Sequence, residues 1–106
     1  DVLVSNSALH HFHNPFRFWA ALKKLGKSNC IHIHRDLIRP HSQEKAFEIK
    51  EKKLSNSPEI LKKDFYASLK ASFTVEEVSQ QLVDAGLSQL EVFQVDELYF
   101  EIIGCI

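Results

Sequence analysis

Polar side chains that could do chemistry follow directly after a short apolar run at the start of the chain. Val2-Leu3-Val4 is followed by Ser5, Asn6 and Ser7 and then by His10 and His11. Small polar residues let a ligand approach the backbone closely and supply hydrogen-bond donors and acceptors. Histidine titrates near neutral pH, so it can take a proton from a reacting group. The pattern predicts a ligand site with a proton acceptor. The structural alternative is a capped strand end with a histidine packed beneath the next helix.

A second polar group ends the next predicted strand, which begins at Cys30-Ile31-His32 and contains Asp36 at its far end. Ligands of open α/β sheets bind beyond the carboxyl ends of the strands. Asp36 and the following Arg39 are therefore predicted to contact a substrate. Tyr66, on a later predicted helix, is expected to turn its hydroxyl toward the same crevice. Ordinary half-buried packing is the alternative for Tyr66.

Six histidines in 106 residues raise the question of a metal site. His10, His11 and His13 follow one predicted strand, and His32 and His34 alternate on the next. Their spacing does not match a closed zinc site, so we predict no bound metal. His32 is expected in the packed core with a hydrogen-bond partner.

The spacing of apolar and capping residues predicts the elements that position these groups. They are a strand at 1–5, a helix at 15–25, a strand at 30–37, helices at 42–53, 58–71 and 74–85, and strands at 90–95 and 98–103. Thr74 and Glu77 form a capping box at the start of the last helix, and Gly86 ends it. The short connection Asp96-Glu97 predicts an antiparallel hairpin. The order predicts an α/β fold in which parallel strands precede an antiparallel terminal pair.

Composition narrows the class of protein. A chain of 106 residues with 44% hydrophobic and 25% charged residues is typical of one globular domain. A net charge of −1 and the lack of a long basic run give no reason to expect nucleic acid as a partner. No apolar run approaches the roughly 18 residues needed to cross a membrane. Cys30 and Cys105 are isolated in apolar runs, which predicts two buried thiols in a reducing compartment, the cytoplasm, and no disulfide.

The ordered set of motifs resembles the C-terminal half of a class I S-adenosylmethionine-dependent methyltransferase of the small-molecule type. The segments that carry the resemblance are DVLVSNSALHHFHNP, CIHIHRDLIRP, DFYASLKASFTVEEVSQQLVDAGL and the terminal hairpin. They are similar to the family's fourth strand with its loop, its fifth strand, the helix before its sixth strand, and its sixth and reversed seventh strands. The family's glycine-rich loop and its acidic ribose-holding residue have no counterpart. The three glycines are Gly26, Gly86 and Gly104, each at or near the end of an element.

The resemblance implies a Rossmann-like sheet and methyl transfer from S-adenosylmethionine to a small-molecule acceptor, within a longer enzyme. Residues 1–106 would be a partial methyltransferase domain whose N-terminal cofactor-binding half is absent, and residues 37–73 a helical cover over the substrate. Ser5, Asn6 and Ser7 would approach the methionine part of the cofactor, with His10 or His11 as the base. Asp36, Arg39 and Tyr66 would contact the acceptor.

Two other functions stay open at this point. One is a non-catalytic α/β binding or dimerisation module derived from a truncated methyltransferase. The other is a different Rossmann-like nucleotide enzyme such as a reductase, against which the terminal hairpin argues. We expect the chain alone to bind S-adenosylmethionine weakly or not at all. The uncovered edge at Val2–Val4 favours self-association, and Cys30 and Cys105 are expected close together without a disulfide.

Overall fold

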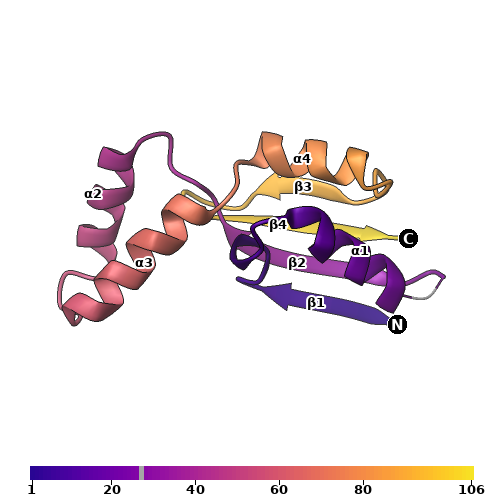
Figure 1. Ribbon diagram of the computed structural model, residues 1–106, viewed down its shortest axis with the longest axis horizontal. Coiled ribbons are helices and arrows are strands. Elements are labelled where there is room, and N and C mark those ends of the chain that lie inside the picture. Colours follow the sequence, from indigo (N-terminus) through magenta and orange to yellow (C-terminus); the bar gives the residue numbers. More distant parts are fainter. Residues whose placement is uncertain (27) are drawn as a thin grey trace.

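A computed structural model describes residues 1–26 and 28–106. The elements in chain order are β1 (Val2–Asn6), the short 3-10 turn η1 (Leu9–His11), α1 (Pro15–Leu25), β2 (Ile31–Leu37), α2 (Gln43–Lys53), α3 (Glu59–Ala71), α4 (Val75–Asp84), β3 (Glu91–Gln94) and β4 (Tyr99–Cys105). The strands form one four-stranded sheet in the order β1-β2-β4-β3. The fold is therefore a mixed α/β fold, as the sequence predicts (Figure 1).

The strand pairing follows the predicted change from parallel to antiparallel. β1 pairs with β2 in parallel, while β4 is antiparallel to both β2 and β3. Cys105 lies opposite Ile31, the neighbour of Cys30, so the two cysteines are close as predicted. Both thiols are free, but the prediction that both are buried is wrong for Cys105: Cys30 is buried, whereas Cys105 points to the other face of the sheet and is exposed.

Local capping explains where the predicted helices begin and end. Asn14 accepts a hydrogen bond from the backbone of Phe16 at the start of α1, where Pro15 needs no partner for its nitrogen. Both bonds of the predicted capping box are present at the start of α4. Gly86 ends that helix with a φ of +73°, a conformation that glycine adopts without strain.

The main core lies between one face of the sheet and the helices α1 and α4. Trp19 of α1, Leu82 of α4 and Phe100 of β4 are all buried there. Trp19 also donates its indole N–H to Oε1 of Gln81 on α4, at 3.0 Å. This bond satisfies two polar groups inside the core and joins the two helices.

Helices α2 and α3 form a separate pair beyond the carboxyl ends of β1 and β2 (Figure 1). Their small core holds Ala46, Ile49 and Leu69 together with Leu37 and Leu98. The apolar side chains of α3 are only partly buried, because Ile60 and Leu61 are 64% and 51% exposed. A two-helix pair has a narrow contact line, so the first turn of α3 extends past the residues it could pack against.

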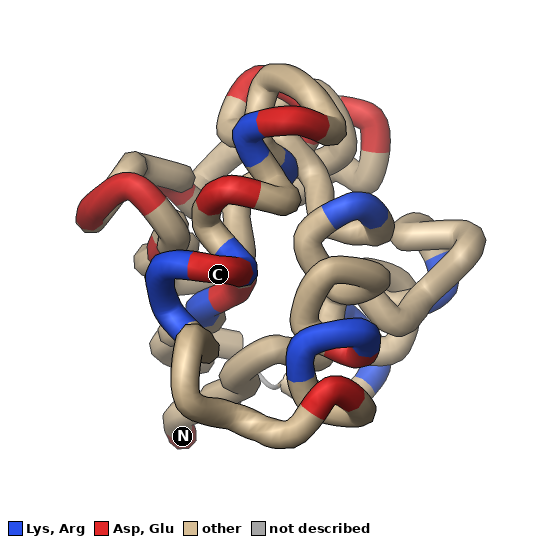
Figure 2. Tube along the Cα trace, turned by 90° about the vertical axis from the view of Figure 1, so that its left-hand side faces the viewer, with Lys and Arg blue, Asp and Glu red and all other residues tan. Residues whose placement is uncertain are grey.

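Charged residues are distributed over this fold without a region of one sign. Figure 2 shows Lys and Arg interspersed with Asp and Glu along the chain. Within the described residues, no helix is long and apolar enough to cross a membrane.

Candidate functional site

The histidine His10 and the carboxylate Asp36 meet where β1 and β2 end. The turn η1 follows β1 and carries His10, and Asp36 lies near the end of β2. His10 Nδ1 lies 2.7 Å from one carboxylate oxygen of Asp36, and the backbone N–H of His10 donates to the other oxygen at 2.9 Å. The backbone N–H of Leu37 also donates to Asp36, at 2.7 Å. Both side chains are buried, so this pairing is protected from water.

The carboxylate of Asp36 fixes which nitrogen of His10 carries the proton. A carboxylate can only accept hydrogen bonds, so Nδ1 of the neutral ring is the donor and Nε2 has the free lone pair. Nε2 is buried and has no hydrogen-bond partner among the described residues. A buried polar nitrogen without a partner is unusual in a folded protein and asks for an explanation. A histidine oriented in this way can accept a proton on Nε2.

An open crevice of about 470 Å³ lies beside His10, between η1 and α3. It is lined by His10, His11, His13, Asp64, Ala67, Ser68 and Ala71. The His11 ring stacks on the His10 ring with centroids 4.1 Å apart. Asp64 and Ser68 were not predicted to line a site, because in the sequence they lie on an ordinary polar face of a helix. Their three- and four-residue spacing with Ala67 and Ala71 is the only signal, and it marks a face of small and polar residues.

Ser5 belongs to a chain of hydrogen bonds that runs into the core. Its hydroxyl oxygen lies 2.8 Å from Nδ1 of His34, and Nε2 of His34 lies 3.2 Å from Nδ1 of His32. Burial and the neighbouring His32 lower the pKa of His34 to about 4, and burial also lowers the pKa of His32. Both rings are therefore neutral near pH 7. His32 lies in the packed core with a hydrogen-bond partner, as predicted from the sequence.

Asn6 and Ser7 are the polar residues that remain at the open end of β1. Asn6 is exposed. Ser7 has a φ of +59°, a left-handed conformation that is costly for a residue other than glycine. Its backbone N–H donates to the carbonyl of Arg35 at 2.8 Å, which holds it in place. Strain of this kind concentrates at functional sites.

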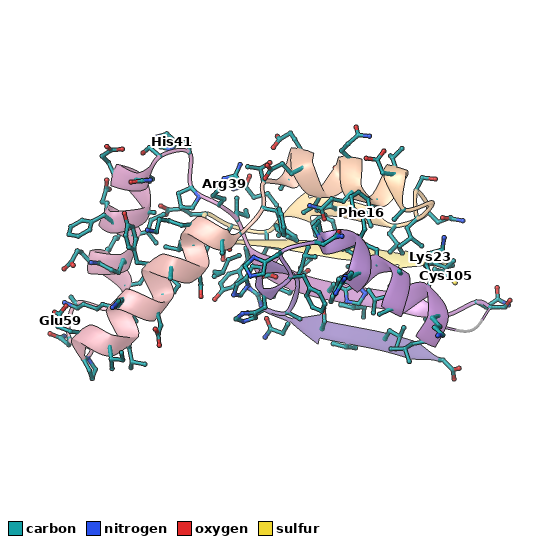
Figure 3. All side chains as sticks on the ribbon, viewed as in Figure 1. Phe16, Lys23, Arg39, His41, Glu59 and Cys105 are labelled. Carbon is teal, nitrogen blue, oxygen red and sulfur yellow. The ribbon has the colours of Figure 1, made fainter. Side chains whose placement is uncertain are left out.

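Arg39 and Tyr66 lie apart from the His10 crevice. Arg39 forms an ion pair with Glu77 at 3.0 Å, and Figure 3 shows it beside His41 in the connection from β2 to α2. The Tyr66 ring packs against Phe47 of α2 in a T-shaped arrangement, with the two ring centroids 6.2 Å apart. The expected orientation of Tyr66 toward the crevice is wrong, because the pairing of α3 with α2 turns this residue away from η1. Asp36 is likewise an interior partner of His10 and does not line the crevice.

The histidines do not assemble into a metal site. No group of three or more His, Cys, Asp or Glu residues in the described part of the chain is placed to hold a metal ion. His10, His32 and His34 instead use ring nitrogens for the hydrogen bonds given above.

Comparison with known proteins gives one informative match. No model of a protein family and no curated protein matches the chain. Among solved structures, the crystal structure of a SAM dependent methyltransferase from Aquifex aeolicus is similar, with a TM-score of 0.61 and 17% sequence identity. The chain has a methyltransferase-like fold. The match covers 100% of this chain and 45% of that enzyme, so the chain spans less than half the length of the methyltransferase.

Proposed function

We propose that this chain forms the acceptor side of a methyltransferase that uses S-adenosylmethionine and methylates a small molecule. The fold supports the first half of this proposal, since the solved structure that matches the whole chain is that of a SAM dependent methyltransferase. The observation that carries the second half is the His10–Asp36 pair, which borders an open crevice at the carboxyl edge of the sheet. This edge is where ligands bind in open α/β sheets.

The residues present fit one end of the cofactor. Asn6 and Ser7 offer short polar side chains at the end of β1, and the constrained backbone of Ser7 lets a ligand approach closely. These groups suit the amino and carboxylate groups of the methionine part. When bound, the cofactor supplies an electrophilic methyl group, so the chain has to orient the acceptor and manage its proton.

His10 is the residue that we assign to the proton. Asp36 holds Nδ1–H, which leaves Nε2 as the nitrogen that can accept a proton from an acceptor. Asp36 acts through His10, so its role is to position and not to bind substrate. The acceptor would lie in the crevice under α3, where Asp64 and Ser68 can hydrogen-bond to it.

Arg39 and Tyr66 then stabilise the helical pair that forms the far wall of the crevice. Arg39 joins the connection before α2 to the start of α4 through Glu77. Tyr66 packs between α2 and α3, with the ammonium group of Lys70 4.4 Å from its ring centre. Substituting either residue should affect acceptor binding indirectly, through the position of α3.

The test is a comparison of methyl transfer by His10→Gln, Asp36→Asn and the control His11→Gln, in the protein at its native length with a panel of phenols and amines. General-base catalysis typically contributes about 10²–10⁴-fold. We expect His10→Gln to lower kcat by about 100-fold or more and Asp36→Asn by a similar order, with His11→Gln within about threefold. Equal activity of His10→Gln and wild type would refute the assignment.

A further inference from the structure

The crevice between η1 and α3 carries a negative charge without a partner. Among the described residues that line it there is one carboxylate, Asp64, and no lysine or arginine. Asp64 forms no ion pair or hydrogen bond with another residue that the structure describes. By contrast, Glu48, Glu51 and Glu59 on the same helical pair each lie between 3.0 and 3.6 Å from a lysine ammonium group. The crevice therefore presents an anionic group to a ligand.

The sequence of α3 explains why Asp64 has no cation beside it. Side chains three or four positions apart are neighbours on a helix surface. At these distances from Asp64 the residues are uncharged, namely Ile60, Leu61, Ala67 and Ser68. The lysines of α3 lie elsewhere: Lys62 pairs with Glu51 and Glu59, and Lys70 lies over the Tyr66 ring. The helix thus keeps its cations away from the crevice.

The groups beside Asp64 suit a ligand that donates hydrogen bonds. Ser68 is one helical turn from Asp64 and lines the same crevice. A carboxylate can only accept hydrogen bonds, and a hydroxyl can accept them as well. A primary ammonium group has three N–H donors and a positive charge, so it can bind Asp64 and Ser68 together. A carboxylate or phosphate group would instead be repelled by Asp64.

His10 provides a second, independent sign of a ligand at this crevice. Its side chain is 5% exposed, and Nε2 has no hydrogen-bond partner among the described residues. Figure 1 shows α3 passing from α2 toward the turn after β1 that carries His10. The stretch of α3 that lines the crevice runs from Asp64 to Ala71, which is two turns or about 10 Å. Asp64 lies at one end of this stretch, so the crevice suits an elongated molecule.

We propose that the acceptor is a small molecule with a protonated amine, which Asp64 and Ser68 bind while the atom to be methylated lies at His10. This inference rests on the proposed function, since it takes the crevice as the acceptor site. It assigns to Asp64 the selection of the substrate class. The cationic group and the methylated atom lie at different positions in the acceptor.

Three phenols that differ in the charge of their tail test this selection. They are tyramine, which is cationic, 4-ethylphenol, which is neutral, and 3-(4-hydroxyphenyl)propionate, which is anionic. Binding to the protein at its native length is followed by the NMR signals of the His11 and His13 rings, which line the crevice. The measurements are made at about pH 8.5, above the range in which histidine normally titrates. We expect tyramine to bind at least about fivefold more tightly than 4-ethylphenol, with the anionic phenol weakest. Added salt should weaken only the binding of tyramine.

Two substitutions of Asp64 separate its charge from its shape. Asp64→Asn keeps the size of the side chain, and it should remove the preference for tyramine without changing the binding of 4-ethylphenol. Asp64→Lys should reverse the preference in favour of the anionic phenol. The matched control is Glu59→Gln, which removes a carboxylate from the first turn of α3, at the end of the helix away from the sheet (Figure 3). This control should bind all three phenols as wild type does.

Methyl transfer to the same phenols is measured separately from binding, so the two proposals fail in different ways. If no phenol is methylated but tyramine binding still depends on Asp64, the proposed methyl transfer is refuted and the cation site is supported. Equal affinities of tyramine and 4-ethylphenol would overturn the inference. So would tyramine binding that is unchanged in Asp64→Asn, or an absence of tyramine binding at millimolar concentration.

Discussion

The buried imidazole of His34 should make the fold sensitive to mild acid. The pKa of a histidine in the unfolded chain is near 6.5, whereas in the fold burial and His32 lower the pKa of His34 to about 4. As the pH falls below 6.5, His34 becomes protonated in the unfolded chain. In the folded chain the same ring stays neutral until about pH 4. The contribution of neutral His34 to the free energy of unfolding is therefore fully present above pH 6.5 and is lost between pH 6.5 and pH 4.

The size of this effect follows from the difference between the two pKa values. Between pH 7 and pH 5 it removes about 2 kcal/mol from the free energy of unfolding. A domain of this size has about 5–15 kcal/mol in total. Carboxylates, with ordinary pKa values near 4, contribute little in this range. The hydrogen-bond partners of His34 are Ser5 and His32, and the rings of Phe18 and Trp19 lie beside it. Within the described part of the chain, no carboxylate forms a hydrogen bond with His34 that would compensate its charge.

Urea denaturation followed by Trp19 fluorescence measures the effect at pH 7, 6 and 5. The centroid of the Trp19 ring lies 6.2 Å from that of His34, and Trp19 is the single tryptophan of the chain. His34→Gln can still hydrogen-bond but cannot titrate, so it should remove most of the pH dependence whatever its stability at pH 7. His11→Gln, at an exposed ring, should keep the wild-type dependence. Parallel pH profiles for wild type and His34→Gln would show that the reasoning is wrong.

Two further stability predictions follow from caps and close contacts, each measured by the same urea denaturation. Thr74→Ala removes the side-chain acceptor for the backbone N–H of Glu77, 3.1 Å away, and should cost about 1 kcal/mol; an unchanged midpoint would contradict it. Gly104→Ala would place a Cβ atom 2.8 Å from the backbone oxygen of Gln89 and 2.9 Å from Cα of Leu90, and should cost about 1–3 kcal/mol. Gly26→Ala, whose nearest contact is 3.1 Å, should cost less, and the reverse order would refute the comparison.

The order and type of the elements could be predicted because their signals are local. The Thr74–Glu77 capping box, Gly86 and the hairpin at Asp96-Glu97 each depend on residues within a few positions of one another, and all three form as predicted. The pairing of β4 with β2 is not local. It was expected from the family resemblance, which explains why Cys105 could be placed near Cys30.

The site could be predicted only in part, because side-chain partners depend on contacts across the fold. The sequence indicated that His10 and Asp36 lie at neighbouring strand ends, but not that they bond to each other. Ser5 was expected to face a ligand, whereas β1 alternation places it on the core face beside His34. Tyr66 was expected at the crevice but packs toward α2. Helical periodicity shows which side of α3 is apolar, but it does not show which neighbouring element that side contacts.

Asp36 both holds the turn η1 against the end of β2 and orients the His10 ring. Asp36 accepts two hydrogen bonds from His10 and one from Leu37, so it fastens the turn after β1 to the end of β2. The same contacts orient the imidazole, whose Nε2 has no hydrogen-bond partner among the residues that the structure describes. A buried charge with three donors is well compensated, and its removal would leave those donors unsatisfied. The position of η1, and with it the crevice between η1 and α3, therefore depends on the same carboxylate that orients the His10 ring.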